Sequence, residues 1–262
     1  MRITAPVEKM TAMMTNKQYL TDHFDHSVLA ECGFLLIPKM ADQAFISKWY
    51  GQYKNDRFYP LDRHPSRMML CDEADGRELL EADFLKMLGR ELFDGNTGCH
   101  FPQIFRKNGE YRDKVFLHND IMYMTGSAER YSLFIALTDC HPKNGGLILY
   151  PGTHKLGLLG DAGELDNKSL PDGFPTVCPS LAPGDILLMH SAVWHESEPN
   201  LEGSERLYIE IKLNHIDDPT NQLEICGTRN AEWALPEKVD EIFVNSRIQR
   251  ILRMGKQGAT PD

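Results

Sequence analysis

Three pairs of side chains in this sequence could bind a metal ion, because each places a histidine two residues before an aspartate. The pairs are His23 with Asp25, His118 with Asp120, and His215 with Asp217. With 10 histidines and 38 acidic residues in 262, about one or two His-x-acid pairs are expected by chance. On a β-strand, residues i and i+2 point to the same face, whereas on a helix they diverge by about 200°. Only a pair on a strand can therefore readily share one ion.

The pair His118 and Asp120 has the most suitable context. It follows a β-type run at 114–117, and further histidines lie downstream. His23 lies in a stretch expected to be helical, and no histidine follows His215. Two imidazoles and one carboxylate on one face of an octahedron leave three positions open, which suits an Fe(II) oxygenase that also binds a co-substrate and O2. The third ligand is expected to be His190 or His195.

Arg206 helps to choose between these histidines, because it follows His195 by eleven residues. A hairpin through 196–205 would bring it beside His195 on an adjacent antiparallel strand. There its guanidinium could bind the far end of a dicarboxylate through two parallel hydrogen bonds. The run at 206–213 alternates, with Arg206, Tyr208, Glu210 and Lys212 on one face and apolar residues on the other. This pattern favours a strand that lines a ligand cavity.

The elements around these residues are expected to form one domain, 1–262. Helices are predicted at 17–31, 41–54 and 76–93, with an opening strand at 33–38. Short β-runs at 100–105, 114–117, 131–137, 146–150, 185–190 and 206–213 alternate with Gly/Pro/Asn turns, which indicates an antiparallel sandwich or barrel. The chain thus divides into N-terminal helices and an opening strand (1–99), a β-core (100–214) and a helical extension (215–262) that includes 236–254. The loop at 157–174 is a candidate lid.

Residues from about 100 to 213 resemble the phytanoyl-CoA dioxygenase-like family of Fe(II)/2-oxoglutarate-dependent oxygenases. The matching segments are His118-Asn-Asp120-Ile-Met-Tyr123, Asn144-Gly-Gly through His154-Lys, Pro183-Gly-Asp through His195-Glu-Ser197, and Arg206. Their order and spacing agree with the family. The resemblance implies a mainly β fold with flanking helices, built on a double-stranded β-helix (jelly-roll, cupin-like) barrel.

Position by position, the resemblance also implies the site. His118, Asp120 and His195 would bind Fe(II), and Arg206 would pair with the C5 carboxylate of 2-oxoglutarate. Ser197 would assist Arg206, and Tyr123 and Gln103 match positions that often touch the co-substrate. The family couples oxidative decarboxylation of 2-oxoglutarate by O2 to the oxidation of a substrate C–H bond. Related halogenases carry a small residue in place of the carboxylate ligand, so Asp120 favours hydroxylation.

Composition sets limits on the partners. The formal net charge of −10 argues against a nucleic-acid-binding surface, and no apolar run is long enough to span a membrane. The first residues lack the apolar centre of a secretory signal, and the six cysteines form no C-x-x-C pair. We therefore expect buried thiols, a cytoplasmic location and a small-molecule substrate. The oligomeric state stays open.

Other interpretations remain. The chain could be a cupin-type metal-dependent isomerase or lyase, or a non-catalytic binding protein on the same scaffold. The segment Asp139-Cys-His141 is expected to form a turn rather than a second site. The substrate is not determined, because resemblance at the level of fold does not transfer it. An anionic group on it could be bound by basic residues among Arg57, Arg63, Arg67 and Lys107.

Overall fold

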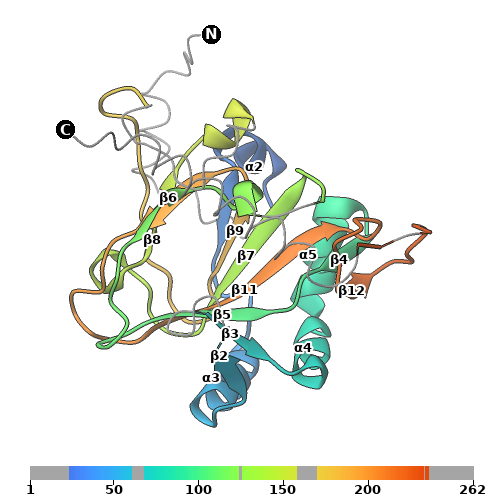
Figure 1. Ribbon diagram of the computed structural model, residues 1–262, viewed down its shortest axis with the longest axis horizontal. Coiled ribbons are helices and arrows are strands. Elements are labelled where there is room, and N and C mark those ends of the chain that lie inside the picture. Colours follow the sequence, from blue (N-terminus) through green and yellow to red (C-terminus); the bar gives the residue numbers. More distant parts are fainter. Residues whose placement is uncertain (1–23, 61–67, 124–125, 158–169, 233, 236–262) are drawn as a thin grey trace, which may run out of the picture.

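The structure is a computed structural model that describes residues 24–60, 68–123, 126–157, 170–232 and 234–235 (Figure 1). The predicted helix at 236–254 and most of the proposed lid at 157–174 lie outside these residues, as does the first part of the helix predicted at 17–31. No helix in the described part of the chain is long and apolar enough to span a membrane.

A nine-stranded antiparallel sheet forms the larger layer. Its strand order is β1-β9-β7-β11-β5-β3-β2, with β4 paired to β11 and β12 paired to β4. The strands are β1 (Phe34–Ile37), β2 (Phe58–Pro60), β3 (Met68–Cys71), β4 (Thr97–Cys99), β5 (Gln103–Lys107), β7 (Arg130–Ala136), β9 (Ile186–His190), β11 (Arg206–His215) and β12 (Leu223–Cys226). Strand β11 is central, because it pairs with β7 on one side and with β5 and β4 on the other.

A three-stranded sheet forms the second layer, in the order β6-β10-β8. Its strands are β6 (Val115–His118), β8 (Leu147–Tyr150) and β10 (Trp194–Ser197). In Figure 1, β6 and β8 lie across from β9, β7 and β11. A small apolar cluster of Leu117, Tyr150, Leu170 and Trp194 packs around this sheet, while the main core lies against the larger one.

The predicted hairpin from His195 to Arg206 is wrong. Strand β10 pairs with β6 and β8, whereas β11 pairs with β4, β5 and β7, so the connection crosses from one sheet to the other. Backbone bonds from Asn200 to Arg112 and from Leu201 to Lys143 hold the crossing segment against other loops. These long-range bonds replace the local ladder that a hairpin would have formed.

Among the described residues, four α-helices flank the larger sheet: α2 (His26–Cys32), α3 (Gln43–Lys54), α4 (Glu73–Leu80) and α5 (Asp83–Phe93). The predicted helix at 41–54 is confirmed, with Asp42 as its N-cap. The single helix predicted at 76–93 is instead two, because Ala82 adopts an extended conformation (ψ 127°) and α5 begins anew after it. The helical prediction for the chain after Asn214 is wrong at 223–226, which forms β12.

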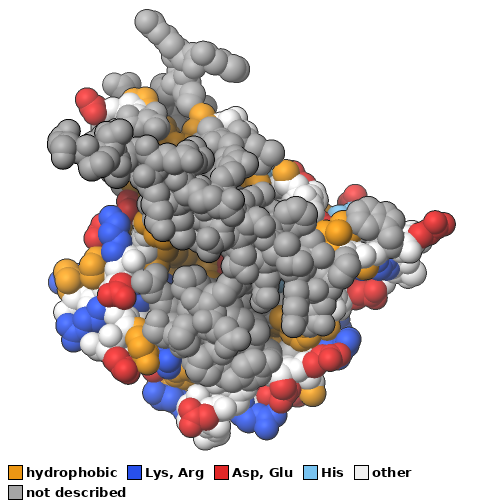
Figure 2. All heavy atoms as spheres, viewed as in Figure 1, with side chains coloured by type: hydrophobic (Ala, Val, Ile, Leu, Met, Phe, Trp, Pro, Cys, Tyr) orange, Lys and Arg blue, Asp and Glu red, His pale blue; other side chains and the backbone are white. Residues whose placement is uncertain are grey.

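The described residues show the mixed surface charges and free thiols expected of an ordinary globular protein (Figure 2). Figure 2 shows Lys and Arg interspersed with Asp and Glu along the lower edge of the visible face. Among the described cysteines, Cys32, Cys99 and Cys140 are buried and free as predicted, whereas Cys178 and Cys226 are only half-buried. Burial raises the pKa of Cys140 to about 12, so this thiol stays protonated.

Candidate metal centre

Two β-strands and one turn place His118, Asp120 and His195. His118 ends β6 and lies directly opposite His195 of β10 in the antiparallel register. Asp120 begins the short 3₁₀ helix η2 (Asp120–Tyr123), and its backbone N–H donates to the carbonyl of Ser191 at 2.8 Å. The turn is therefore tied to the segment that leads into β10, so all three side chains are positioned from the same region.

The donor atoms of these residues converge on one point. Oδ1 of Asp120 lies 3.7 Å from Nε2 of His118 and 3.6 Å from Nε2 of His195. All three donor atoms lie within 4.8 Å of one another. The described residues contain no other group of three or more such side chains arranged this way. Two imidazole nitrogens and one carboxylate oxygen fit a ferrous ion with open positions.

Both histidines have their far nitrogen fixed by a backbone carbonyl. Nδ1 of His118 lies 2.8 Å from the Phe116 carbonyl oxygen, and Nδ1 of His195 lies 3.0 Å from that of Val193. A carbonyl only accepts, so each Nδ1 must carry the hydrogen and each Nε2 keeps its lone pair for a metal. Burial lowers the pKa of His118 to about 3, and His195 adds to this effect. His118 is therefore neutral at physiological pH, as a ligand must be.

The two oxygens of Asp120 have different partners. Oδ1 faces the histidines, while Oδ2 accepts hydrogen bonds from Ser132 Oγ at 2.7 Å and Lys212 Nζ at 2.8 Å. Burial would raise the pKa of Asp120, but Lys212 and the two histidines outweigh it and hold this pKa well below its usual range. Lys212 also donates to Glu210 Oε1 at 2.7 Å. The carboxylate is therefore ionised and held in one orientation.

Beyond the metal donors, two buried cations lie opposite each other on β5 and β11. Arg206 is paired in register with Lys107, and both side chains are almost fully buried. The Arg206 guanidinium lies over the Tyr208 ring, 4.6 Å from its centroid, and its Nε has no hydrogen-bond partner among the described residues. Lys107 Nζ donates to Ser197 Oγ at 2.8 Å, which links the two sheets. The arrangement provides positive charge and a hydroxyl for an anionic group.

Comparison with known proteins places this geometry in a family. Residues 52–207, more than half of the chain, match the family described as phytanoyl-CoA dioxygenase (PhyH). The chain belongs to the phytanoyl-CoA dioxygenase family. The predicted resemblance is thereby confirmed. No curated protein sequence matches the chain.

Several solved structures share the fold. The epimerase SnoN, in complex with Fe3+, alpha-ketoglutarate and nogalamycin RO, is 16% identical, with a TM-score of 0.62 over 74% of this chain and 83% of that one. EvdO2 from Micromonospora carbonacea var. aurantiaca, complexed with 2-oxoglutarate, is 19% identical, with a TM-score of 0.62 over 73% and 91%. The carbocyclase SnoK from nogalamycin biosynthesis is 18% identical, with a TM-score of 0.61 over 80% and 88%. The predicted jelly-roll class is confirmed, although the two sheets are not joined into one closed barrel.

Within this member of the phytanoyl-CoA dioxygenase family, the other candidate ligands lie apart from the metal donors. His190 is on β9 of the larger sheet, and its Nε2 lies 3.8 Å from Glu129 Oε2. His215 accepts a hydrogen bond from the backbone of Asp217 at the end of β11. His23 lies outside the described residues. Of the two histidines considered as the third ligand, only His195 joins His118 and Asp120.

The remaining predicted contacts are those of Gln103 and Tyr123 with the co-substrate and those of the arginines with an anionic substrate group. Gln103 lies on β5, paired in register with Glu210 of β11. Tyr123 lies in η2, but its side chain is outside the described part of the structure. Arg57, considered for an anionic substrate group, instead pairs with Asp72 and Asp75, and Arg63 and Arg67 lie outside the described residues.

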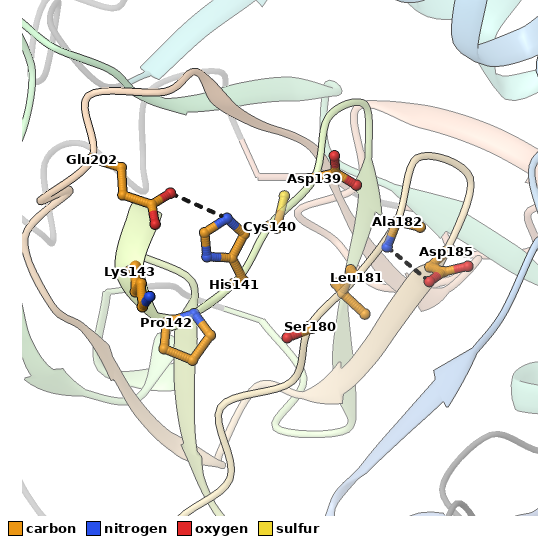
Figure 3. Close-up of a pocket in the computed structure, with 10 residues that line it drawn as sticks. All are labelled: Asp139, Cys140, His141, Pro142, Lys143, Ser180, Leu181, Ala182, Asp185 and Glu202. Carbon is orange, nitrogen blue, oxygen red and sulfur yellow. Dashed lines mark hydrogen bonds and ion pairs between the residues drawn. The ribbon is translucent and has the colours of Figure 1, made fainter.

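The segment Asp139–His141 lines a separate open pocket of about 660 Å³ (Figure 3). His141 precedes the 3₁₀ helix η3 (Pro142–Asn144), and its Nε2 lies 3.4 Å from Glu202 Oε2. Asn144 donates to the Asp139 carbonyl and accepts from the His141 backbone. These bonds are those of a turn, as predicted.

Sequence reasoning missed two contacts of the metal centre, those of Lys212 and Ser132 with Asp120. The alternation along 206–213 predicted that Lys212 lies on the polar face of its strand, and this was the sequence signal for its contact with Asp120. Ser132 lies opposite Lys212 on β7. Its position could not be read from the sequence, because the pairing of β7 with β11 joins residues far apart in the chain.

Proposed function

We propose that this chain is an Fe(II)- and 2-oxoglutarate-dependent dioxygenase that hydroxylates a C–H bond of a small or medium-sized metabolite, releasing succinate and CO2. The observation that carries the proposal is the convergence of His118, Asp120 and His195, with Asp120 Oδ1 3.6–3.7 Å from both Nε2 atoms. The family match and the iron- and 2-oxoglutarate-containing relatives support it.

The chain's own residues prepare the metal donors. Carbonyl groups hold both imidazoles in the tautomer that exposes Nε2, and burial keeps His118 unprotonated. Lys212 and Ser132 occupy Asp120 Oδ2, which leaves Oδ1 for the ion. A ferrous ion held there supplies the redox chemistry that couples O2 reduction to decarboxylation of 2-oxoglutarate and oxidation of the substrate.

Arg206 and Ser197 would bind the far carboxylate of the co-substrate. Among the described residues, Nε of the buried Arg206 has no hydrogen-bond partner, so it is available to donate to an anionic group of a ligand. Lys107 sets the direction of the Ser197 hydroxyl. An ammonium can only donate, so Ser197 Oγ must accept from it, and the Ser197 O–H is left to donate to a carboxylate. Tyr123 and the carboxamide N–H groups of Gln103 would complete the co-substrate pocket, and Gln103 Oε1 would be left free to accept from another group.

Two other functions would use the same scaffold. A cupin-type isomerase or lyase would need the metal donors but has no use for a buried arginine with an unpartnered Nε, and a non-catalytic binding protein would not need donors kept in a metal-ready tautomer. Structural relatives include an epimerase and a carbocyclase. Retention of Asp120 as the third donor argues against halogenation, and we propose hydroxylation as the reaction. Incorporation of one oxygen atom from isotopically labelled O2 into the product tests this choice.

The first experiment records visible absorbance of the Fe(II)-loaded protein without oxygen as 2-oxoglutarate is added. A weak charge-transfer band is expected in the wild type, because the co-substrate chelates the ion. Arg206→Ala should require a much higher 2-oxoglutarate concentration for the same band, whereas Arg77→Ala, on the exposed face of α4, should not. If iron binds but no band forms, the co-substrate assignment fails and the isomerase or lyase interpretation replaces it.

A further inference from the structure

Glu210 carries an acceptor that the described protein does not satisfy. Its side chain is 3% exposed and lies on the same face of β11 as Arg206 and Lys212. Oε1 accepts from Lys212 at 2.7 Å, but Oε2 is buried and has no hydrogen-bond partner among the described residues. A buried carboxylate oxygen without a donor is costly, so its retention requires an explanation.

A second such atom lies on the neighbouring strand. Gln103 is paired in register with Glu210, so the two side chains share one face of the sheet. The carboxamide Oε1 of Gln103 is also buried and without a hydrogen-bond partner in the described part of the chain. Two unsatisfied acceptors on directly opposed residues indicate a shared binding position for a group that donates hydrogen bonds.

This position adjoins the metal donors. Lys212 bridges the two carboxylates, since its Nζ lies 2.7 Å from Glu210 Oε1 and 2.8 Å from Asp120 Oδ2. One side chain therefore separates Glu210 from a proposed iron ligand. A molecule bound at Glu210 and Gln103 would lie close to the reacting centre.

The co-substrate cannot be the missing donor. 2-Oxoglutarate carries two carboxylates and a keto oxygen, all of which accept hydrogen bonds at neutral pH. The charges around Glu210 also favour a donor at this position. Lys212 is a single cation shared by two carboxylates, and the metal ion would lie beside Asp120 rather than beside Glu210. Burial raises the pKa of Glu210, and a donor at Oε2 would favour its ionised form.

We propose that Glu210, with Gln103 beside it, is a specificity-determining residue that binds an amine or hydroxyl group of the substrate. The inference rests on the proposed oxygenase function and adds the chemical class of the substrate group that this position binds. A substrate that presents a carboxylate to this position would meet a like charge and two acceptors, so it would be rejected.

The test uses three probes that share a six-membered ring and differ in the polar group: cyclohexylamine, cyclohexanol and cyclohexanecarboxylate. Binding of each to the Fe(II)- and 2-oxoglutarate-loaded protein is measured without oxygen by ligand-observed NMR at millimolar concentration. The amine or the alcohol should bind at least about tenfold more tightly than the carboxylate. Dependence on the amine rather than the alcohol would identify an ammonium group, and the reverse a hydroxyl group.

Variants test whether Glu210 and Gln103 cause the preference for the amine or the alcohol. Glu210→Leu should abolish it, and Glu210→Gln, which keeps the shape, should weaken the amine more than the alcohol. Gln103→Leu should weaken both. Glu224→Gln, an exposed glutamate on β12, is the matched control and should bind like the wild type. Thermal unfolding confirms that each variant is folded.

The proposal is overturned if all three probes bind alike, if none binds detectably, or if the preference survives in both Glu210 variants. The charge-transfer band, recorded on the same samples, keeps this outcome separate from the proposed function. A normal band without a probe preference would reject only the substrate inference. An absent band would reject the oxygenase function, whatever the probes show.

Discussion

The ammonium of Lys212 lies 2.8 Å from Oδ2 of Asp120, while Oδ1 of the same carboxylate lies 3.6–3.7 Å from the two histidines. One oxygen is thus occupied by a buried cation and the other is presented to a metal. Burial lowers the pKa of Lys212, but Asp120 and Glu210 outweigh it and hold that pKa above its ordinary value, so the cation is permanent. Lys212 would therefore act on a bound metal through the orientation of Asp120.

Replacing Lys212 by methionine should weaken Fe(II) binding by about 10–100-fold, because residues that orient a metal ligand typically contribute this much. Anaerobic titration of the metal-free protein against a competing chelator measures the change. Lys212→Arg, which keeps a cationic donor, should lose less. Lys86→Met, a lysine on α5 paired with Glu81, serves as control. Equal affinities in wild type and Lys212→Met would show that Asp120 needs no such support.

Lys107 and Ser197 should act as one unit in co-substrate binding. Lys107→Met and Ser197→Ala are each expected to weaken 2-oxoglutarate binding, since the first frees the hydroxyl to turn and the second removes it. The double variant should be little worse than the more severe single one, with a coupling free energy of about 1 kcal/mol. The charge-transfer titration provides all four dissociation constants. Strictly additive losses would mean that the 2.8 Å bond between them does not orient the hydroxyl.

The metal-free protein should lose stability as the pH falls from 6.5 towards 4. Burial lowers the pKa of His118 to about 3 in the folded chain, whereas an unfolded histidine titrates near 6.5. Below 6.5 the unfolded state therefore binds a proton that the folded state does not, so the free energy of unfolding falls by up to about 1.4 kcal/mol per pH unit. Urea unfolding across this range measures the slope. His118→Gln should flatten it, and a slope unchanged by that substitution but reduced in His26→Gln would contradict the assignment.

Arg130 should be among the side chains most important for stability. It is buried, its guanidinium donates to Thr220 Oγ at 2.9 Å, and it lies 3.5 Å from the buried Asp218. Arg130→Met leaves that carboxylate without its cation and should lower the free energy of unfolding by roughly 3–5 kcal/mol. Arg77→Met, which breaks an exposed pair on α4, should cost less than about 0.5 kcal/mol. Similar denaturation midpoints for the two variants would refute this ranking.

Much of the β-core could be predicted because its strands leave local patterns. The runs that became β6, β7, β8, β9 and β11 alternate or are continuously apolar, and turn residues bound them. Strands β2, β3, β4, β10 and β12 were not predicted; β2 ends in Pro60 and β4 contains Gly98, and both residue types interrupt a strand pattern. In β10, moreover, Glu196 interrupts the apolar pattern although it is buried, with Tyr150 donating to it at 2.7 Å.

The site was predictable only where the order of residues carried the information. A triplet at a strand exit predicted His118 and Asp120, but the residues alone left His190 or His195 as the third ligand, and the hairpin argument that favoured His195 was wrong. The contact of Lys212 with Asp120 spans 92 positions, and it depends on how β11 faces the turn after β6. The hairpin prediction was wrong for the same reason. The closeness of β10 and β11 in sequence suggested that they pair, but the two strands belong to different sheets.

The division of the metal centre between the sheets links cofactor occupancy to the architecture. Both histidines belong to the three-stranded sheet, while Ser132 and Lys212, on the nine-stranded sheet, hold Asp120. A bound ion would therefore act as a cross-link between layers, and its binding free energy would oppose their separation. Substitutions that only loosen the packing between the sheets would then lower metal affinity without touching a ligand. Slower amide exchange in β6 and β10 on metal binding would be the visible sign of that reinforcement.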